Sequence, residues 1–212
     1  MASNQACSPH QFSELVSETN ISFQRAKFTH ALEQGEKALI CGQSLNFSHN
    51  SRFIRLLNQL NHIYKKLDQL SDVRGRVEET YIQSRDQLGN EHEITMQSRD
   101  LYYEVLIKEK NYMEAITIAS ENIAAAENNS QEGFRKHHYL IQLYSLYGLT
   151  GQYKKEAETL LILIDLADTL FGKNDEETRK YVLDLAKNYC RQRALSAFDR
   201  WIKKNSLQYR CE

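Results

Sequence analysis

The chain has 212 residues, which is long enough for one large domain or one array of repeats with a buried core. Its hydrophobic content of 41% and charged content of 26% exclude a disordered chain. The formal net charge of −1 gives no support for a protein that binds nucleic acid or an anionic membrane.

Helical periodicity runs along the whole chain. The sequence contains one proline, Pro9, and this favours long helices because proline removes a helical hydrogen bond. Apolar residues recur every three to four positions, as in Leu57, Leu60 and Tyr64, which places them on one helix face. No segment alternates as a strand does. We predict an all-α chain with helices near 10–24, 28–45, 51–66, 70–88, 91–109, 112–127, 131–149, 153–171, 175–190 and 193–205.

Three helix-start signals support these boundaries. Ser8 with Gln11 precedes the first helix, with Pro9 in its first turn. Asn90 with Glu93, and Asn174 with Glu177, have the spacing of a capping box, in which the first side chain accepts from free backbone amides. We therefore expect both asparagines to cap helices.

The sequence repeats itself at a period of 42 residues. In four segments a large apolar residue is followed, about one turn later, by a small or branched one. The second residues of these pairs are Ala31, Val73, Ala115 and Ala157, at intervals of 42. The linker QLGNEHEIT from Gln87 returns as LFGKNDEET from Leu170. Regular self-similarity of this length indicates a solenoid of helix pairs, in which Ala115 should be buried.

The segments KNYMEAITIASENI from Lys110 and GQYKKEAETLL from Gly151 resemble the turn and second helix of a tetratricopeptide repeat. The period and the LG-x-x-H linker are similar to the lengthened repeats of kinesin light chain. The resemblance covers roughly residues 11–204. It implies a right-handed α-solenoid of about five antiparallel helix pairs at 10–205, between tails at 1–9 and 206–212. The small residue usual in the first helix is replaced by Asn61, Tyr103, Tyr144 and Leu185.

In the family that the chain resembles, the first helices line a concave groove that receives a peptide or a partner helix. Carried onto this sequence, the groove positions are Arg55, Asn58, His62, Lys66, Gln97, Asp100, Glu104, Lys108, His138, Ile141, Ser145, Leu149 and Arg179. The alternative is that these residues are simply solvated helix faces. Val16 and Asn20 stand where chaperone-binding repeats need Lys and Asn, so we do not expect binding to the tail of a heat-shock chaperone.

Motifs that carry catalysis are missing from the sequence, which contains no P-loop, dinucleotide-binding fingerprint, nucleophile elbow or HExxH. We therefore expect no enzyme and no cofactor. His137 and His138 are adjacent and point to different faces, so we expect polar groove or surface residues rather than metal ligands. The four cysteines form no ligand-like cluster, and we expect reduced thiols, with Cys41 and Cys190 in the core.

The sequence thus favours a non-catalytic, cytoplasmic adaptor or scaffold that binds another protein. The basic residues Arg55 and Lys66, beside Lys108, favour an acidic segment as ligand. The alternative is a peptide-sensing regulator whose solenoid changes curvature. We expect no membrane insertion, because the most apolar stretch, from Leu160 to Phe171, is too short to span a bilayer. Self-association stays open, and the locally basic C-terminal end is interpreted as a solvated cap.

Overall fold

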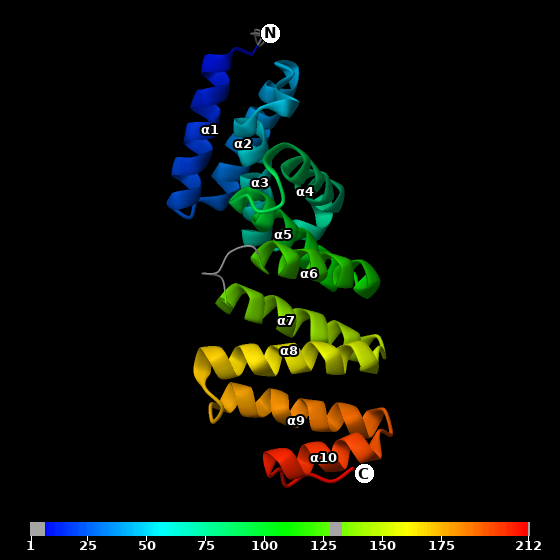
Figure 1. Ribbon diagram of the computed structural model, residues 1–212. Helices are drawn as coiled ribbons and strands as arrows, with labels where there is room; N and C mark the ends of the chain where they lie inside the picture. The colour runs from blue at the N-terminus through cyan, green and yellow to red at the C-terminus, as the bar shows by residue number, and fades with distance from the viewer. Residues whose placement is uncertain (1–6, 128–132, 212) are drawn as a thin grey trace. The chain divides into compact units, whose positions relative to one another are not determined.

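The computed structural model describes residues 7–127 and 133–211, and within these ranges the chain is all-helical with no strand (Figure 1). The expected all-α class is therefore confirmed. The residues fall into two compact units, Met1–Glu109 and Lys110–Glu212, which we call unit 1 and unit 2. The division into a repeat domain at 10–205 and two tails stays a prediction.

Unit 1 consists of antiparallel helices that pack against their sequence neighbours. Its elements are α1 (Pro9–Gln24), α2 (Phe28–Ser44), η1 (Phe47–His49), α3 (Ser51–Lys66), η2 (Leu70–Val73), α4 (Arg74–Leu88) and α5 (Glu93–Lys108). The helix expected at 70–88 begins with the tighter 3-10 turn η2 and becomes α-helical only at Arg74.

Unit 2 continues the same pattern of antiparallel neighbours, with α7 against α8 and α8 against α9. Its elements are α6 (Tyr112–Glu127), α7 (Gly133–Leu149), α8 (Tyr153–Phe171), α9 (Glu176–Arg191) and α10 (Leu195–Asn205). The first two residues of the helix expected at 131–149 lie outside the described residues.

The helix starts are only partly as expected. Ser8 caps α1, and its Oγ accepts a hydrogen bond of 3.2 Å from the Gln11 amide. The two asparagine caps are wrong. The cap of α5 is His92, whose Nδ1 accepts from the Ile94 amide at 3.1 Å, and the cap of α9 is Asp175. Both helices begin one or two residues later than the capping-box spacing suggests, because the linker before them contains a further turn.

The recurring linker has a backbone reason. Gly89 and Gly172 end α4 and α8 with φ of +91° and +95°, backbone angles that residues other than glycine rarely adopt. Their amides donate to the carbonyl oxygens of Arg85 and Asp168 in the last helical turn. The two linkers therefore resemble each other because both must reverse the chain at the same kind of helix end.

Buried polar pairs explain one departure from the repeat pattern. Asn61 lies in α3 where the resemblance leads one to expect a small residue, and it is fully buried. Its Nδ2 donates to Thr80 Oγ1 in α4 at 3.1 Å, and Thr80 is also fully buried. This bond satisfies the donor side of the buried amide, while its Oδ1 has no partner in the described chain, and it joins α3 to α4 where a small residue was expected.

The cysteines contradict the expectation of free thiols. Cys7 is bonded to Cys41, and Cys190 to Cys211, with Cα–Cα distances of 5.4 and 5.5 Å that suit a disulfide. The bonded cysteines are 34 and 21 residues apart in the sequence, so no local motif predicts the two disulfides. Cys41 is buried, as expected, but Cys190 is only partly buried. The expectation of a cytoplasmic location loses its support from free thiols, since disulfides are rare in reducing compartments.

His137 also differs from its expected position at the surface or in a groove. Its side chain is buried, at 6% exposed, and its ring packs edge-on against Phe171 and Tyr181 with centroid distances of 5.1 and 5.6 Å. Burial lowers the pKa of His137 below its ordinary value of 6.5, although Glu177 at 3.9 Å opposes the change. The imidazole is therefore neutral at pH 7 and serves as a core residue.

Replacing Ala115 by Asp should destabilise the chain strongly. Ala115 is fully buried in α6, as the repeat pattern predicts, so the new carboxylate would lose its water without gaining a partner. We expect a loss of about 3 kcal/mol or more in the free energy of unfolding, measured by denaturant titration. Ser120→Asp, at an exposed position of the same helix, should change it by less than about 0.5 kcal/mol. Equal effects of the two variants would contradict this burial.

The disulfides predict a simple alkylation result. Under denaturing, non-reducing conditions, mass spectrometry should find no alkylated cysteine, and after reduction it should find all four. Reduction should also lower the free energy of unfolding by about 2–4 kcal/mol for each bridge, because the unfolded chain regains the freedom of two closed loops. Alkylation of any cysteine without reductant would show that its bridge is absent.

His137 should make stability depend on pH. Because its folded pKa is lowered, the neutral form stabilises the fold above the ordinary pKa of 6.5, and this contribution is lost as pH falls below that value. His137→Phe should therefore reduce the loss of unfolding free energy between about pH 7.5 and pH 5. His49→Phe is the matched control, since His49 is exposed in unit 1 and does not contribute to the lowered pKa of His137, and it should leave that loss unchanged. The same pH slope in parent and His137→Phe would argue against this role.

Candidate partner-binding site

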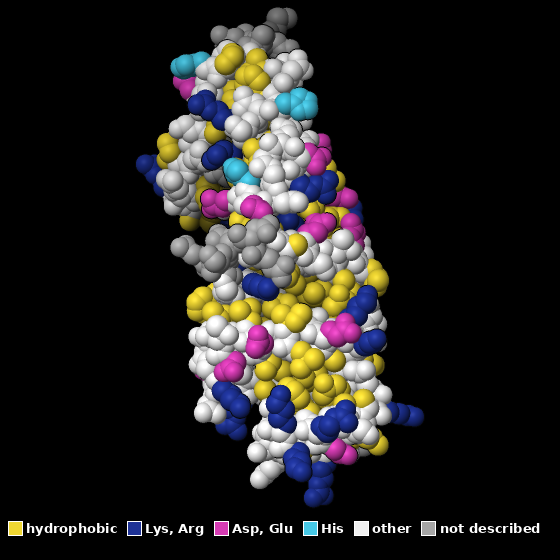
Figure 2. Space-filling view, viewed as in Figure 1, with side chains coloured by type: hydrophobic (Ala, Val, Ile, Leu, Met, Phe, Trp, Pro, Cys, Tyr) yellow, Lys and Arg dark blue, Asp and Glu magenta, His cyan; other side chains and the backbone are white. Residues whose placement is uncertain are grey.

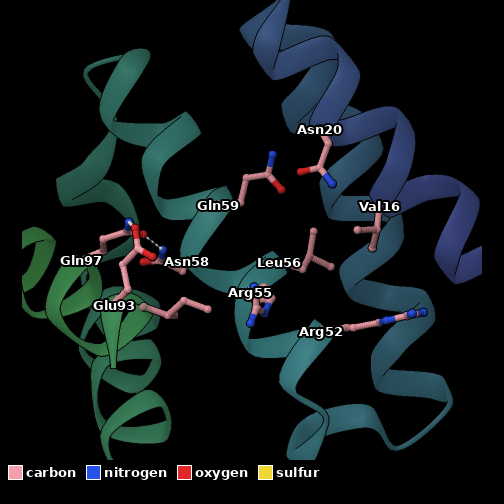
Figure 3. A pocket seen from close by; sticks show the side chains of 10 residues that line it. Val16, Asn20, Arg52, Arg55, Leu56, Asn58, Gln59, Glu93 and Gln97 are labelled. Atoms are coloured by element: carbon pink, nitrogen blue, oxygen red, sulfur yellow. Dashed lines mark hydrogen bonds between the residues drawn. The ribbon is translucent and has the colours of Figure 1, made fainter. Parts of the chain in front are cut away.

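A cavity of about 400 Å³ opens in unit 1 among α1, α3 and α5 (Figure 3). We call it the α3 cavity, since α3 supplies its centre. Its lining residues are Val16, Asn20, Arg52, Arg55, Leu56, Asn58, Gln59, Glu93, Ile94 and Gln97. The three contributing helices are the first helices of their pairs, the elements that the resemblance assigns to a groove.

The α3 cavity combines apolar side chains with amides. Asn58 donates through Nδ2 to Gln97 Oε1 at 2.9 Å, which links α3 to α5. The Oδ1 atom of Asn58 is buried and has no hydrogen-bond partner in the described chain. Across the cavity, the side chains of Gln59 and Asn20 extend toward one another from α3 and α1 (Figure 3). Each amide carries both donor and acceptor atoms, so the cavity offers both kinds of hydrogen-bonding group.

Charge in the α3 cavity is predominantly positive. Arg52 and Arg55 lie exposed on α3, and neither has a carboxylate at ion-pair distance among the described residues. The opposing charge is Glu93, whose Oε1 accepts from Gln97 Nε2 at 3.1 Å. The lining therefore holds two guanidinium groups and one carboxylate, a composition suited to a carboxylate-bearing ligand.

The predicted stripe continues along α3 and α5 beyond the cavity. Lys66 is exposed, whereas His62 is half-buried, and burial followed by the charge of Lys65 lowers the pKa of His62. His62 is consequently not a cation at neutral pH. Lys108 pairs with Asp68 at 3.0 Å, and Glu104 pairs with Lys65. Those ion pairs leave Arg55 and Lys66 as the cations of the stripe that a partner can reach without breaking an internal pair.

The candidate residues of unit 2 lie in two different places. His138 is exposed on α7 beside Gln142, and Ser145 lines a cavity that also involves α9 and Tyr209. Arg179 lies elsewhere, in a cavity formed by α8, α9 and α10. The structure thus brings Arg55, Asn58 and Gln97 into one cavity and separates Arg179 from Ser145.

Sequence reasoning missed Arg52, which lies one turn before Arg55 and lines the same cavity. Its position at i−3 from Arg55 was the available signal. Within residues 7–127 and 133–211, no group of three His, Cys, Asp or Glu side chains could hold a metal ion. Among the same residues, no helix is long and apolar enough to cross a membrane.

No protein-family model and no curated protein matches the sequence. Solved structures do match the fold. Nearly identical TPR-like repeats of a Podosopora anserina kinesin light chain align with a TM-score of 0.66 at 14% identity, over 94% of this chain and 95% of that one. BtubC (BKLC) from P. vanneervenii aligns with a TM-score of 0.63 at 13% identity, over 78% and 66%.

The apo form of RapI aligns with a TM-score of 0.63 at 11% identity over 92% of this chain, which spans about half (52%) of RapI. A Rap protein complexed with competence and sporulation factor aligns with a TM-score of 0.51 at 14% identity, again over 92% of this chain and 54% of that one. Identities this low establish architecture alone. The chain has the fold of a tetratricopeptide-like helical solenoid, similar to the repeats of kinesin light chain.

Proposed function

We propose that this chain is a non-catalytic adaptor that binds a peptide segment of another protein in the α3 cavity and along the adjoining stripe of α3 and α5. The observation that carries the proposal is the composition of the cavity, in which an unpaired amide oxygen and two reachable guanidinium groups surround apolar side chains. The fold supports it, because stacked helix pairs offer extended surfaces for binding.

The cavity suits an extended segment better than a compact ligand. A peptide backbone presents a donor and an acceptor at each residue, and the amides of Asn20 and Gln59 can satisfy both. Leu56 and Ile94 would contact an apolar side chain of that segment. The buried Asn58 Oδ1 would accept a hydrogen bond that the chain itself leaves unmade.

The charge distribution selects acidic segments. Arg52, Arg55 and Lys66 are the exposed cations of this surface without an internal ion pair in the described chain, while Glu93 limits the acidity that the site accepts. Charged groups at a rim mainly raise the association rate and the specificity. His138 and Ser145 stay candidates for further contacts in unit 2.

A second candidate function is a peptide-sensing regulator. The specific observation in its favour is the similarity to a Rap protein that was solved in complex with competence and sporulation factor. In that case a bound peptide would change the curvature of this chain, and small-angle scattering with and without the peptide would show a change in its dimensions. A simple adaptor would keep the same scattering profile.

Selection from a displayed random-peptide library on the purified chain should enrich peptides rich in Asp and Glu. For the selected peptides, the double variant Arg55→Glu and Lys66→Glu should weaken binding by about tenfold or more, since each charge pair is lost and replaced by repulsion. Isothermal titration calorimetry would measure the affinities, and circular dichroism would check the fold.

The matched control is Arg25→Glu with Lys27→Glu, which changes the net charge equally at exposed positions in the turn between α1 and α2. This control should alter affinity by less than about threefold at physiological salt, because distant surface charges are screened. If both double variants bind the peptides equally well, the partner uses another surface and the proposed site is wrong.

A further inference from the structure

A second cavity, of about 560 Å³, lies in unit 2 at the C-terminal end of α8, the N-terminal half of α9, and α10. We call it the α9 cavity. Its lining residues are Ile164, Asp168, Lys173, Asn174, Thr178, Arg179, Val182, Trp201, Lys204, Asn205, Ser206 and Leu207. None of them belongs to the α3 cavity, and the volume is in the range of sites for small molecules.

One wall of the α9 cavity is apolar and held in place. Trp201 donates through Nε1 to the carbonyl oxygen of Val182 at 2.9 Å, which fixes the indole of α10 against α9. Ile164 adds an aliphatic surface from α8. Lys204 Nζ lies 5.6 Å from the indole ring centroid, so a cation stands beside this wall. Because the indole uses its only donor internally, it offers a ligand apolar contact rather than a hydrogen bond.

The polar part of the lining is cationic. Lys173, Arg179 and Lys204 are exposed, and none has a carboxylate at ion-pair distance in the described parts of unit 2. The single carboxylate of the lining is Asp168, so cations outnumber it three to one. Figure 2 shows Lys and Arg side chains gathered over α9 and α10, the helices that supply Arg179 and Lys204 to the lining.

Thr178 supplies an independent observation. This residue is 1% exposed, lines the cavity, and has an Oγ1 atom without a hydrogen-bond partner in the described chain. A threonine in a helix normally satisfies its hydroxyl on the carbonyl one turn earlier, and a buried hydroxyl left unpaired is unfavourable. A ligand acceptor atom would remove that deficit.

We propose that the α9 cavity binds a small amphipathic anion, with an aromatic or aliphatic body against Trp201 and Ile164 and one carboxylate or phosphate group near Arg179 and Lys204. The Thr178 hydroxyl donates to the anionic group. Asp168 disfavours ligands with several negative charges, so a singly charged carboxylate binds better than a phosphate. This site is separate from the proposed adaptor surface of unit 1.

Trp201 makes the proposal directly measurable, because it is the only tryptophan in the chain. Its fluorescence and its indole N–H resonance in NMR report on the cavity without a label. Phenylbutyrate should give a saturable change in both signals. Phenylbutyramide, which has the same body without the charge, should bind at least about tenfold more weakly, since it loses the charge-assisted hydrogen bonds. Phenyl phosphate tests the preference for a carboxylate.

Variants of the full chain separate ligand contacts from fold. Arg179→Gln with Lys204→Gln should weaken phenylbutyrate binding by about tenfold. Arg200→Gln with Lys203→Gln, exposed on α10 but outside the lining, should not weaken it more than about twofold. Thr178→Val should weaken binding while leaving the unfolding temperature unchanged or higher, because the chain itself does not use the hydroxyl.

Three results would overturn the proposal. They are no saturable change of the Trp201 signals with phenylbutyrate or phenyl phosphate, equal affinity for the acid and its amide, or unaltered binding in the Arg179→Gln and Lys204→Gln variant. Each would show that Lys173, Arg179 and Lys204 are solvated surface cations that form no ligand site.

Discussion

Close approach between α2 and its neighbours is the constraint on which unit 1 depends. Along one face of α2 the side chains are Ala31, Gly35, Ala38 and Gly42. A Cβ atom added to Gly35 would lie 2.6 Å from Leu60 Cδ2, and one added to Gly42 would lie 2.6 Å from the ring of Phe53. Such separations are far below van der Waals contact, so α3 can pack at this distance only because α2 offers no side chain there. The face of α3 that carries Arg55 and Asn58 toward the α3 cavity is oriented by that contact.

Much of the fold could be predicted from the sequence, because each repeat carries the same signals for where its helices begin and end. Helix ends at 24, 66, 127 and 171 agree with the structure, since period, apolar spacing and turn residues all favour them. The caps of α5 and α9 were misplaced because Asn, His and Asp can all accept from a backbone amide, and only the turn geometry decides among them. The disulfides and the burial of His137 depend on contacts between distant segments, which no local pattern encodes.

For the candidate site, the family resemblance predicted which residues share a helix face better than it predicted which residues of different helices line one cavity. Arg55, Asn58 and Gln97 line one cavity because α3 and α5 are adjacent first helices. The pattern assigned Arg179 to the groove as well, but near the start of α9 it lines a different cavity with α8 and α10. A net charge of −1 also hides the local separation of charge, since Lys65 and Lys108 have internal ion pairs in the described chain while Arg55, Arg179 and Lys204 do not.

The two disulfides have a consequence for how the chain comes apart. In the described chain α1 packs mainly on α2 and α10 mainly on α9, and a helix with one main neighbour opens locally more readily than one packed between two. Here Cys7 is tied to α2 and Cys211 to α9, and each unit holds one bridge. Fraying of α1 or α10 therefore leaves the helix tethered close to its docking surface, where it closes again quickly. After a cut between the units, each fragment keeps one disulfide, which links residues 34 apart in unit 1 and 21 apart in unit 2.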